Sequence, residues 1–169
     1  MPRPAKKELA RQRVSLDLGP GFGEKLLERA EKRPHTRFIG IELHGPHAFR
    51  AADWARARRL SNVSLAKGHS SHLPLRNNSV REVTAENFFA SNKPRTWKNF
   101  QDTLEEAHRV LVPGGSLVVL QAARSRQTEL LKKCIKDFQA RGKFHLKEAE
   151  EVITHRRSGK QLRLVLTKE

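Results

Sequence analysis

The chain has little cysteine and no long apolar run. Its single cysteine, Cys134, has no second cysteine with which to form an internal disulfide or a cysteine-ligated metal site. The longest apolar runs, such as residues 117–120, are far shorter than the ~18–20 residues that a membrane-spanning helix needs. The basic amino terminus is not followed by an apolar stretch of the signal-peptide kind. These absences exclude a disulfide-stabilised secreted scaffold and a zinc knuckle, and they predict a cytoplasmic protein with no membrane span and no metal.

Acidic residues are also scarce relative to basic ones. The chain has 34 Lys and Arg against 18 Asp and Glu, which gives a formal net charge of +16. A charge of this size favours a polyanionic partner, and a merely solvated basic surface is the alternative. Candidate phosphate contacts form three clusters: Arg3, Lys6, Lys7, Arg11 and Arg13; Arg56, Arg58 and Arg59; Arg156, Arg157 and Lys160.

The length and the periodicity predict one α/β domain. A chain of 169 residues corresponds to about one domain, here residues 13–169, after a basic and mobile segment at 1–12. Short apolar runs predict strands at 14–18, 37–43, 63–66, 80–89 and 117–120. A pair at 143–152 and 161–168 is separated by too few residues for a crossover helix, so it should be antiparallel. The predicted fold is a Rossmann-like, doubly wound, seven-stranded sheet that is mostly parallel, with an antiparallel last pair.

Helices between these strands are predicted from apolar residues at helical spacing. Their predicted buried faces are Leu26, Leu27 and Ala30; Phe49, Ala52, Arg56 and Leu60; Phe100, Leu104, Ala107, His108 and Leu111; and Leu130, Leu131, Cys134, Ile135 and Phe138. A turn at Pro113, Gly114 and Gly115 is expected to lead into the fifth predicted strand, at residues 117–120.

A glycine-rich loop follows the first predicted strand and precedes the first helix. It contains Gly19, Pro20, Gly21 and Gly23, a spacing unlike the G-x-G-x-x-G of dinucleotide binders. Backbone N–H groups at such a loop and helix start favour a nucleotide-like ligand. Glu42, at the end of the second strand, is placed to accept hydrogen bonds from both hydroxyls of a ribose.

In order and spacing these motifs resemble the class I S-adenosylmethionine-dependent methyltransferases. The resemblance runs from about residue 14 to 120, through VSLDLGPGFG, FIGIEL, AKGHSSHLPLRNNSVREVTAENFF and EEAHRVLVPGGSLVVL. It implies S-adenosylmethionine as cofactor, with the glycine loop around its methionine and ribose part. It also implies Glu42 at the ribose, and His69 and Ser70 at the adenine. His69 replaces the acidic residue usual in the family. The implied cofactor site is Asp17, Gly19, Pro20, Gly21, Gly23, Glu42, Leu43, His69 and Ser70.

The methyl acceptor is predicted to meet the end of the fourth strand. Asn87 and Glu86 are the candidate catalytic residues that orient the nucleophile, and the candidate substrate contacts are Phe88, Lys93, Arg95 and Trp97. Phe88 stacks on a base in this interpretation, with a place in the core as the alternative. FIGIELHGP and KPRTWKN are similar in part to the tRNA guanine-7 methyltransferases, whereas GHSSHLPLRNNSV is more like the group that includes small-molecule methyltransferases.

The sequence therefore predicts an S-adenosylmethionine-dependent methyltransferase acting on RNA, either tRNA or rRNA. One alternative is a small-molecule methyltransferase whose lid comes from a partner protein or from a second copy in a homodimer. The other is a non-catalytic methyltransferase fold that binds RNA or serves as a partner subunit.

Overall fold

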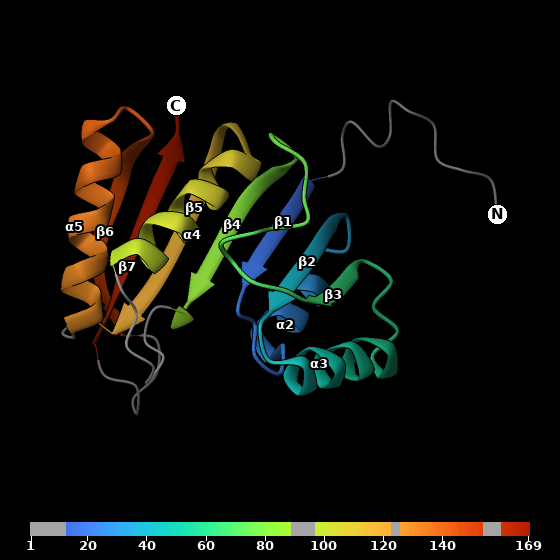
Figure 1. Ribbon diagram of the computed structural model, residues 1–169. Coiled ribbons are helices and arrows are strands. Elements are labelled where there is room, and N and C mark those ends of the chain that lie inside the picture. Colours follow the sequence, from blue (N-terminus) through green and yellow to red (C-terminus); the bar gives the residue numbers. More distant parts are fainter. Residues whose placement is uncertain (1–12, 89–96, 123–125, 154–159) are drawn as a thin grey trace.

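A seven-stranded sheet in the order β3-β2-β1-β4-β5-β7-β6 forms the centre of the molecule (Figure 1). The computed structural model describes residues 13–88, 97–122, 126–153 and 160–169. The expected mobile segment at 1–12 lies outside these ranges. The strands are β1 (Arg13–Leu18), β2 (Thr36–Glu42), β3 (Val63–Lys67), β4 (Val80–Glu86), β5 (Leu111–Ala122), β6 (Phe144–Ile153) and β7 (Lys160–Lys168). The helices are α2 (Glu24–Lys32), α3 (Gly45–Ala57), α4 (Trp97–Val110) and α5 (Arg126–Ala140).

The pairing of the strands confirms the predicted fold class. β1 lies between β2 and β4 and runs parallel to both, with Leu16 opposite Ile39 on one side and Val83 on the other. β4 is parallel to β5, whereas β7 is antiparallel to both β5 and β6. The chain order reverses between β1 and β4, and in open α/β sheets ligands bind at the carboxyl ends of strands beside such a switch point.

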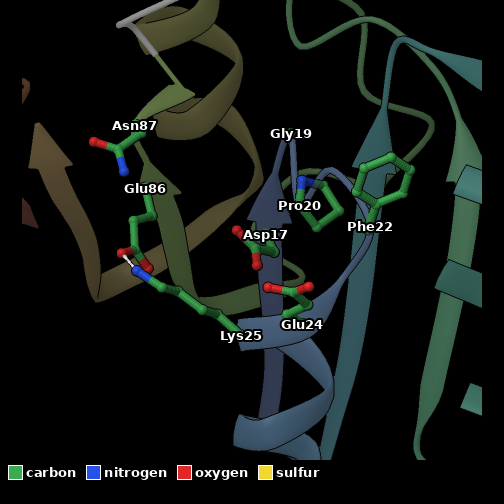
Figure 2. Close-up of a pocket in the computed structure, with 8 residues that line it drawn as sticks. All are labelled: Asp17, Gly19, Pro20, Phe22, Glu24, Lys25, Glu86 and Asn87. Carbon is green, nitrogen blue, oxygen red and sulfur yellow. Dashed lines mark hydrogen bonds and ion pairs between the residues drawn. The ribbon is translucent and has the colours of Figure 1, made fainter. Parts of the chain in front are cut away.

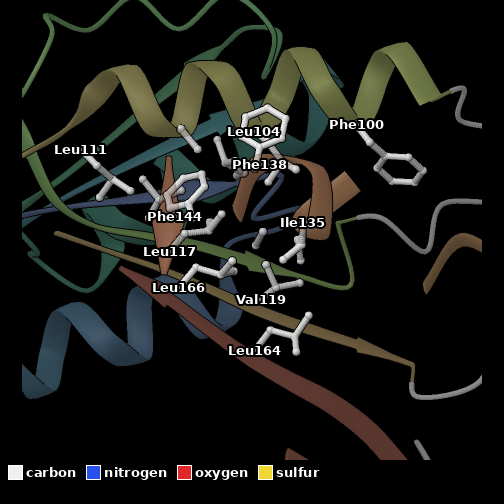
Figure 3. Close-up of a cluster of buried hydrophobic side chains, with 14 of the residues drawn as sticks. Phe100, Leu104, Leu111, Leu117, Val119, Ile135, Phe138, Phe144, Leu164 and Leu166 are labelled. Atoms are coloured by element: carbon white, nitrogen blue, oxygen red, sulfur yellow. The ribbon is translucent and has the colours of Figure 1, made fainter. Parts of the chain in front are cut away.

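The largest core cluster lies between one face of the sheet and the helices α4 and α5 (Figure 3). Alternate residues of β5, such as Leu117 and Val119, point to this face because successive side chains of a strand point to opposite faces. They pack with Phe100 of α4 and Phe138 of α5, and all four are at most 1% exposed. Burial of each such side chain contributes about 1.5–3 kcal/mol. This core fixes the positions at which β4 and β5 end.

The structure corrects the predicted face of α3. The buried residues of this helix are Gly45, Ala48, Ala51 and Ala55, whereas Phe49 is 71% exposed. The helix also ends at Ala57, before Leu60. Small residues face inward because the glycine loop approaches closely. A Cβ on Gly23 would lie 2.8 Å from the Cβ of Ala51.

Two other boundaries also differ from the prediction. β5 begins at Leu111, so this residue and the predicted turn at 113–115 both belong to the strand, and Leu111 is paired with Val80 of β4. It remains fully buried, so its apolar character fits either element. β4 ends at Glu86 instead of residue 89, because Asn87 adopts a left-handed φ of 49° that ends the strand. The carboxyl edge of β4 therefore begins three residues earlier than predicted.

Candidate cofactor and methyl-transfer site

The glycine loop joins β1 to α2 at the carboxyl edge of the sheet. Gly19 and Gly23 have φ values of 65° and 82°, in the left-handed region that favours glycine. The N–H of Gly19 donates to the carbonyl of Ile41 at 2.9 Å, which fixes the start of the loop to β2. The N–H of Gly23 donates to the carbonyl of Pro20 at 2.9 Å, which closes the turn just before α2 begins.

Glu42 connects this loop to the end of β2. Its Oε2 accepts the N–H of Gly21 at 2.9 Å, and its Oε1 accepts the N–H of His44 at the same distance. The residue is only 8% exposed. A carboxylate has about four acceptor positions, so each oxygen retains acceptor capacity for a ribose hydroxyl. The geometry fits the predicted ribose contact, and it also gives Glu42 a second task of holding the loop.

Asp17 is a buried carboxylate at the end of β1. It forms an ion pair with Arg29 of α2, and it accepts the hydroxyl of Thr84 at 3.1 Å. Burial raises its pKa to about 6, because the loss of water around the charge outweighs the attraction of Arg29 and the Thr84 hydrogen bond. A cationic ligand group near this carboxylate would relieve that cost.

A cavity of about 180 Å³ opens between the glycine loop and the end of β4 (Figure 2). Its lining combines Asp17, Gly19, Pro20, Phe22, Glu24, Lys25, Glu86 and Asn87. Lys25, in the first turn of α2, forms an ion pair with Glu86 across this cavity. The carboxylates of the lining are suited to an ammonium group, and Lys25 is suited to a carboxylate. Together they match the amino-acid end of a ligand, which carries both groups. Sites for drug-sized ligands are typically ~300–1,000 Å³, so this cavity suits one end of a larger cofactor.

The predicted reaction centre lies beside this cavity. The N–H of Asn87 donates to the carbonyl of Leu120 at 2.7 Å, and its Oδ1 accepts the amide of Gln161 from β7 at 3.0 Å. Phe88 packs against the core and against the glycine loop. Its ring is so close to Gly19 that a Cβ on this glycine would lie 2.7 Å from it. The structure thus favours the core alternative for Phe88, and its stacking on a base stays a prediction.

The residues predicted at the adenine differ in accessibility. Leu43 is 56% exposed beside Glu42, and His69 is also exposed. The Nδ1 of His69 accepts the N–H of Ser71 at 3.2 Å. Ser70 is buried and its hydroxyl bonds that of Thr103 at 3.0 Å, so it faces α4. The structure therefore leaves His69 and Leu43 available to a ligand and engages the hydroxyl of Ser70 in the core.

Several predicted substrate contacts are not described. Lys93 and Arg95 lie outside the described residues, and Trp97 begins α4 without a described side chain. Within the described part of the chain, no group of three or more His, Cys, Asp or Glu side chains could hold a metal ion. Helices in the same ranges are too short or too polar to cross a bilayer.

Sequence reasoning missed four residues of the site: Lys25, Arg29, Thr84 and Gln161. Lys25 and Arg29 are four residues apart on the first turns of α2, a spacing that places them on one face directly after the glycine loop. That spacing was a usable signal. Gln161 is 74 residues from Asn87 in the sequence, and only the antiparallel insertion of β7 beside β5 brings them together.

Comparison with known proteins shows the family to which the chain belongs. The methyltransferase family model Methyltransf_4 matches residues 11–163. The chain belongs to this family of class I S-adenosylmethionine-dependent methyltransferases. A solved S-adenosylmethionine-dependent methyltransferase from Methanosarcina mazei has the same fold, with a TM-score of 0.75 over 93% of this chain and 92% of that chain at 18% identity.

Two curated relatives are similar over about two thirds of this chain. A tRNA (guanine-N(7)-)-methyltransferase from Rubrobacter xylanophilus is 32% identical over 109 residues, which cover 62% of this chain and 49% of that protein. A demethylmenaquinone methyltransferase from Thermus thermophilus is 32% identical over 114 residues, which cover 68% of this chain and 49% of that protein. The chain thus matches about half the length of these relatives.

The family's cofactor is S-adenosylmethionine, and the residues present fit it. Glu42 would accept hydrogen bonds from the ribose, and Asp17 and Glu86 would hold the methionine ammonium. Lys25 would hold the methionine carboxylate. When bound, the cofactor supplies an electrophilic methyl group on a sulfonium.

Proposed function

We propose that this methyltransferase acts on RNA, with a guanine ring nitrogen of tRNA as the first acceptor to test. The observation that carries the proposal is the similarity to the tRNA (guanine-N(7)-)-methyltransferase, 32% identical over 109 residues. The formal net charge of +16 supports it independently, because a large positive charge attracts the phosphates of a polynucleotide.

The site suits an acceptor that has no proton to lose. A guanine N7 carries a lone pair, so the bond from nitrogen to the methyl carbon forms as the carbon–sulfur bond breaks and its electron pair stays on sulfur. No general base is required, and the residues contribute position and exclusion of water. Among the polar side chains that line the cavity, Glu86 is paired with Lys25 and Asp17 with Arg29, and Asn87 accepts the amide of Gln161.

We assign to Asn87 the orientation of the acceptor base. Its Oδ1 accepts the Gln161 amide, which directs its NH₂ group away from that bond. An NH₂ donor matches the carbonyl O6 that neighbours N7 on guanine. Asn87→Asp keeps the acceptor for Gln161 and replaces the donor by an acceptor, so it should lower kcat by about 10- to 100-fold with little change in cofactor affinity. Equal turnover in wild type and Asn87→Asp would remove Asn87 from the reaction.

The decisive experiment is transfer of a radioactive methyl group from S-adenosylmethionine to separate pools of tRNA, rRNA and lipid extract. Digestion of the labelled RNA and chromatography of its nucleosides identify the methylated base. We expect label in tRNA as a methylguanosine and none with Glu42→Ala. Label in lipid alone, or in no pool while the cofactor binds, would reject an RNA substrate.

A small-molecule acceptor is the second candidate function. The similarity to a demethylmenaquinone methyltransferase, 32% identical over 114 residues, favours it specifically. The same assay separates the two candidates, because a quinone acceptor would carry the label into the organic phase.

A further inference from the structure

Aromatic and basic side chains gather on the outer face of α3, beside the glycine loop. Positions 47, 50, 54 and 58 follow helical spacing and carry His47, Arg50, Trp54 and Arg58. Phe22, from the tip of the glycine loop, completes the group and is 42% exposed. We call Phe22, His47, Arg50 and Trp54 the α3 platform.

Phe22 contacts the rings of His47 and Trp54 in tilted arrangements. The centroid of Phe22 is 4.3 Å from that of His47 and 6.3 Å from that of Trp54. The guanidinium of Arg50 lies 5.3 Å from the centroid of Phe22 and 5.1 Å from that of Trp54. One cation thus contacts two rings, an arrangement that presents π surface and positive charge at the same place.

This face is accessible and its charge is not neutralised. Arg50 is exposed and has no ion-pair partner in the part of the chain that the structure describes. Its neighbours differ, because Arg56 is paired with Asp53 and Arg58 with Glu31. A hollow of about 320 Å³ borders Trp54, with Glu24, Ala57 and Arg58 as its other lining residues.

We propose that the α3 platform binds an unpaired RNA base by stacking and the adjoining phosphate through Arg50. Single-stranded RNA is recognised by bases stacked on aromatic side chains or on arginine guanidinium planes, with cations at the backbone. The partner must be anionic to match Arg50, and it must carry flat rings to use Phe22 and Trp54. Because Phe22 also lines the cofactor cavity, the bound base would be a neighbour of the base that is methylated. The inference rests on the proposed RNA substrate and assigns part of its binding surface.

The test measures binding of a fluorescein-labelled, 12-nucleotide single-stranded RNA and of an abasic strand of the same length. Trp54→Ala should weaken binding of the normal strand by about fivefold to hundredfold, the loss of one stacked base, and leave the abasic strand within twofold. Trp54→Phe should retain most of the affinity. Arg50→Ala should weaken binding of both strands and lower the salt slope by about one.

Arg76→Ala is the matched control, because it removes the same charge from an exposed arginine outside the α3 platform, in the segment that precedes β4. Equal calorimetric affinities for S-adenosylmethionine establish that each variant is folded. If Trp54→Ala fails to fold, the comparison of Arg50→Ala with Arg76→Ala decides, since both side chains are exposed.

The outcomes separate the two proposals. Suppose that the wild type binds RNA, that Arg50→Ala and Arg76→Ala lose equal affinity, and that the Trp54 variants lose none. This result overturns RNA binding by the α3 platform, while the proposed function stands. Absence of any RNA binding by the wild type overturns both.

Discussion

At the scale of single residues, Asp17 carries a free-energy cost of burial. It is 4% exposed, and burial raises its pKa from 3.8 to about 6. Between about pH 4 and 6 the folded state retains a proton that the unfolded state has lost, so stability falls as the pH rises through this window. Above about pH 6 the buried charge costs about 3 kcal/mol, from ~1.4 kcal/mol per pKa unit.

Asp17→Asn should therefore stabilise the protein at neutral pH. The free energy of unfolding at pH 7 should rise by about 1–3 kcal/mol, and the gain should vanish near pH 4. Urea denaturation at several pH values measures it. Glu28→Gln is the control, because its exposed carboxylate has a pKa lowered by its hydrogen bond to Lys32 and should give no gain. A loss of stability in Asp17→Asn at pH 7 would mean that the Arg29 ion pair outweighs burial.

His69 offers a second test at this scale, because an acidic residue usually occupies its position in the family. A carboxylate there could accept the adenine amino group, a bond to a charged acceptor that is worth about 1.5–3 kcal/mol. His69→Asp should tighten binding of S-adenosylmethionine by about 10-fold or more, measured by calorimetry. His72→Asp makes the same charge change three residues away and should have no such effect. Weaker binding in His69→Asp would show that the imidazole itself contacts the adenine.

Sequence motifs predicted the site residues that lie within one short segment of the chain, such as the glycine loop. Gly19, Gly21 and Gly23 follow one strand, and Glu42 ends the next, so strand order alone places them together. The predicted cofactor contacts of these residues remain to be measured. The spacing of Lys25 after the glycine loop was a local signal, but its pairing with Glu86 spans 61 residues. The pairing of Gln161 with Asn87 spans 74 residues, and no local pattern encodes either pairing.

At the scale of elements, periodicity predicted which segments are strands and helices better than which face is buried. Apolar size misidentified the buried face of α3, where Phe49 is exposed and alanines face inward. The reason is tertiary, because only small residues allow α3 to approach the glycine loop. The end of β4 was also misplaced, since one left-handed residue, Asn87, ends the strand before Phe88.

The contact between the glycine loop and α3 gives a test at this scale. Gly23→Ala should destabilise the protein through both a φ of 82° and a Cβ placed 2.8 Å from that of Ala51. Gly114→Ala has a similar φ of 70° but no atom within 4 Å, so it isolates the backbone cost of about 1 kcal/mol. We expect Gly23→Ala to lower the free energy of unfolding by about 1–3 kcal/mol more than Gly114→Ala does. Thermal and urea unfolding of the two variants measure these losses, alongside cofactor affinity. Equal losses of stability in the two variants would contradict the packing argument.

At the scale of the whole molecule, the parallel sheet brings ligand groups to one edge while positive charge extends well beyond it. The glycine loop follows β1, and Glu42 and Glu86 are the last residues of the neighbouring strands β2 and β4. Exposed cations such as Arg37, Arg76 and Arg81 lie elsewhere on the sheet and its loops. The site for the cofactor is therefore local, whereas attraction of a polyanion is a property of the entire surface.

The two kinds of binding should consequently respond differently to salt. Neutralising about four phosphates gives a slope near −3 to −4 in a plot of log affinity against log salt, so RNA affinity should fall about 100-fold from 50 to 200 mM KCl. Affinity for S-adenosylmethionine should change less than about twofold, because Asp17 and Glu42, the carboxylates proposed to hold it, are buried and buried charges are screened less by salt. Fluorescence anisotropy with tRNA and calorimetry with the cofactor measure the two slopes on one preparation. If tRNA affinity does not change with salt, the surplus positive charge is only a solvated surface. If the protein also methylates a lipid-soluble acceptor, the assignment changes to a small-molecule methyltransferase.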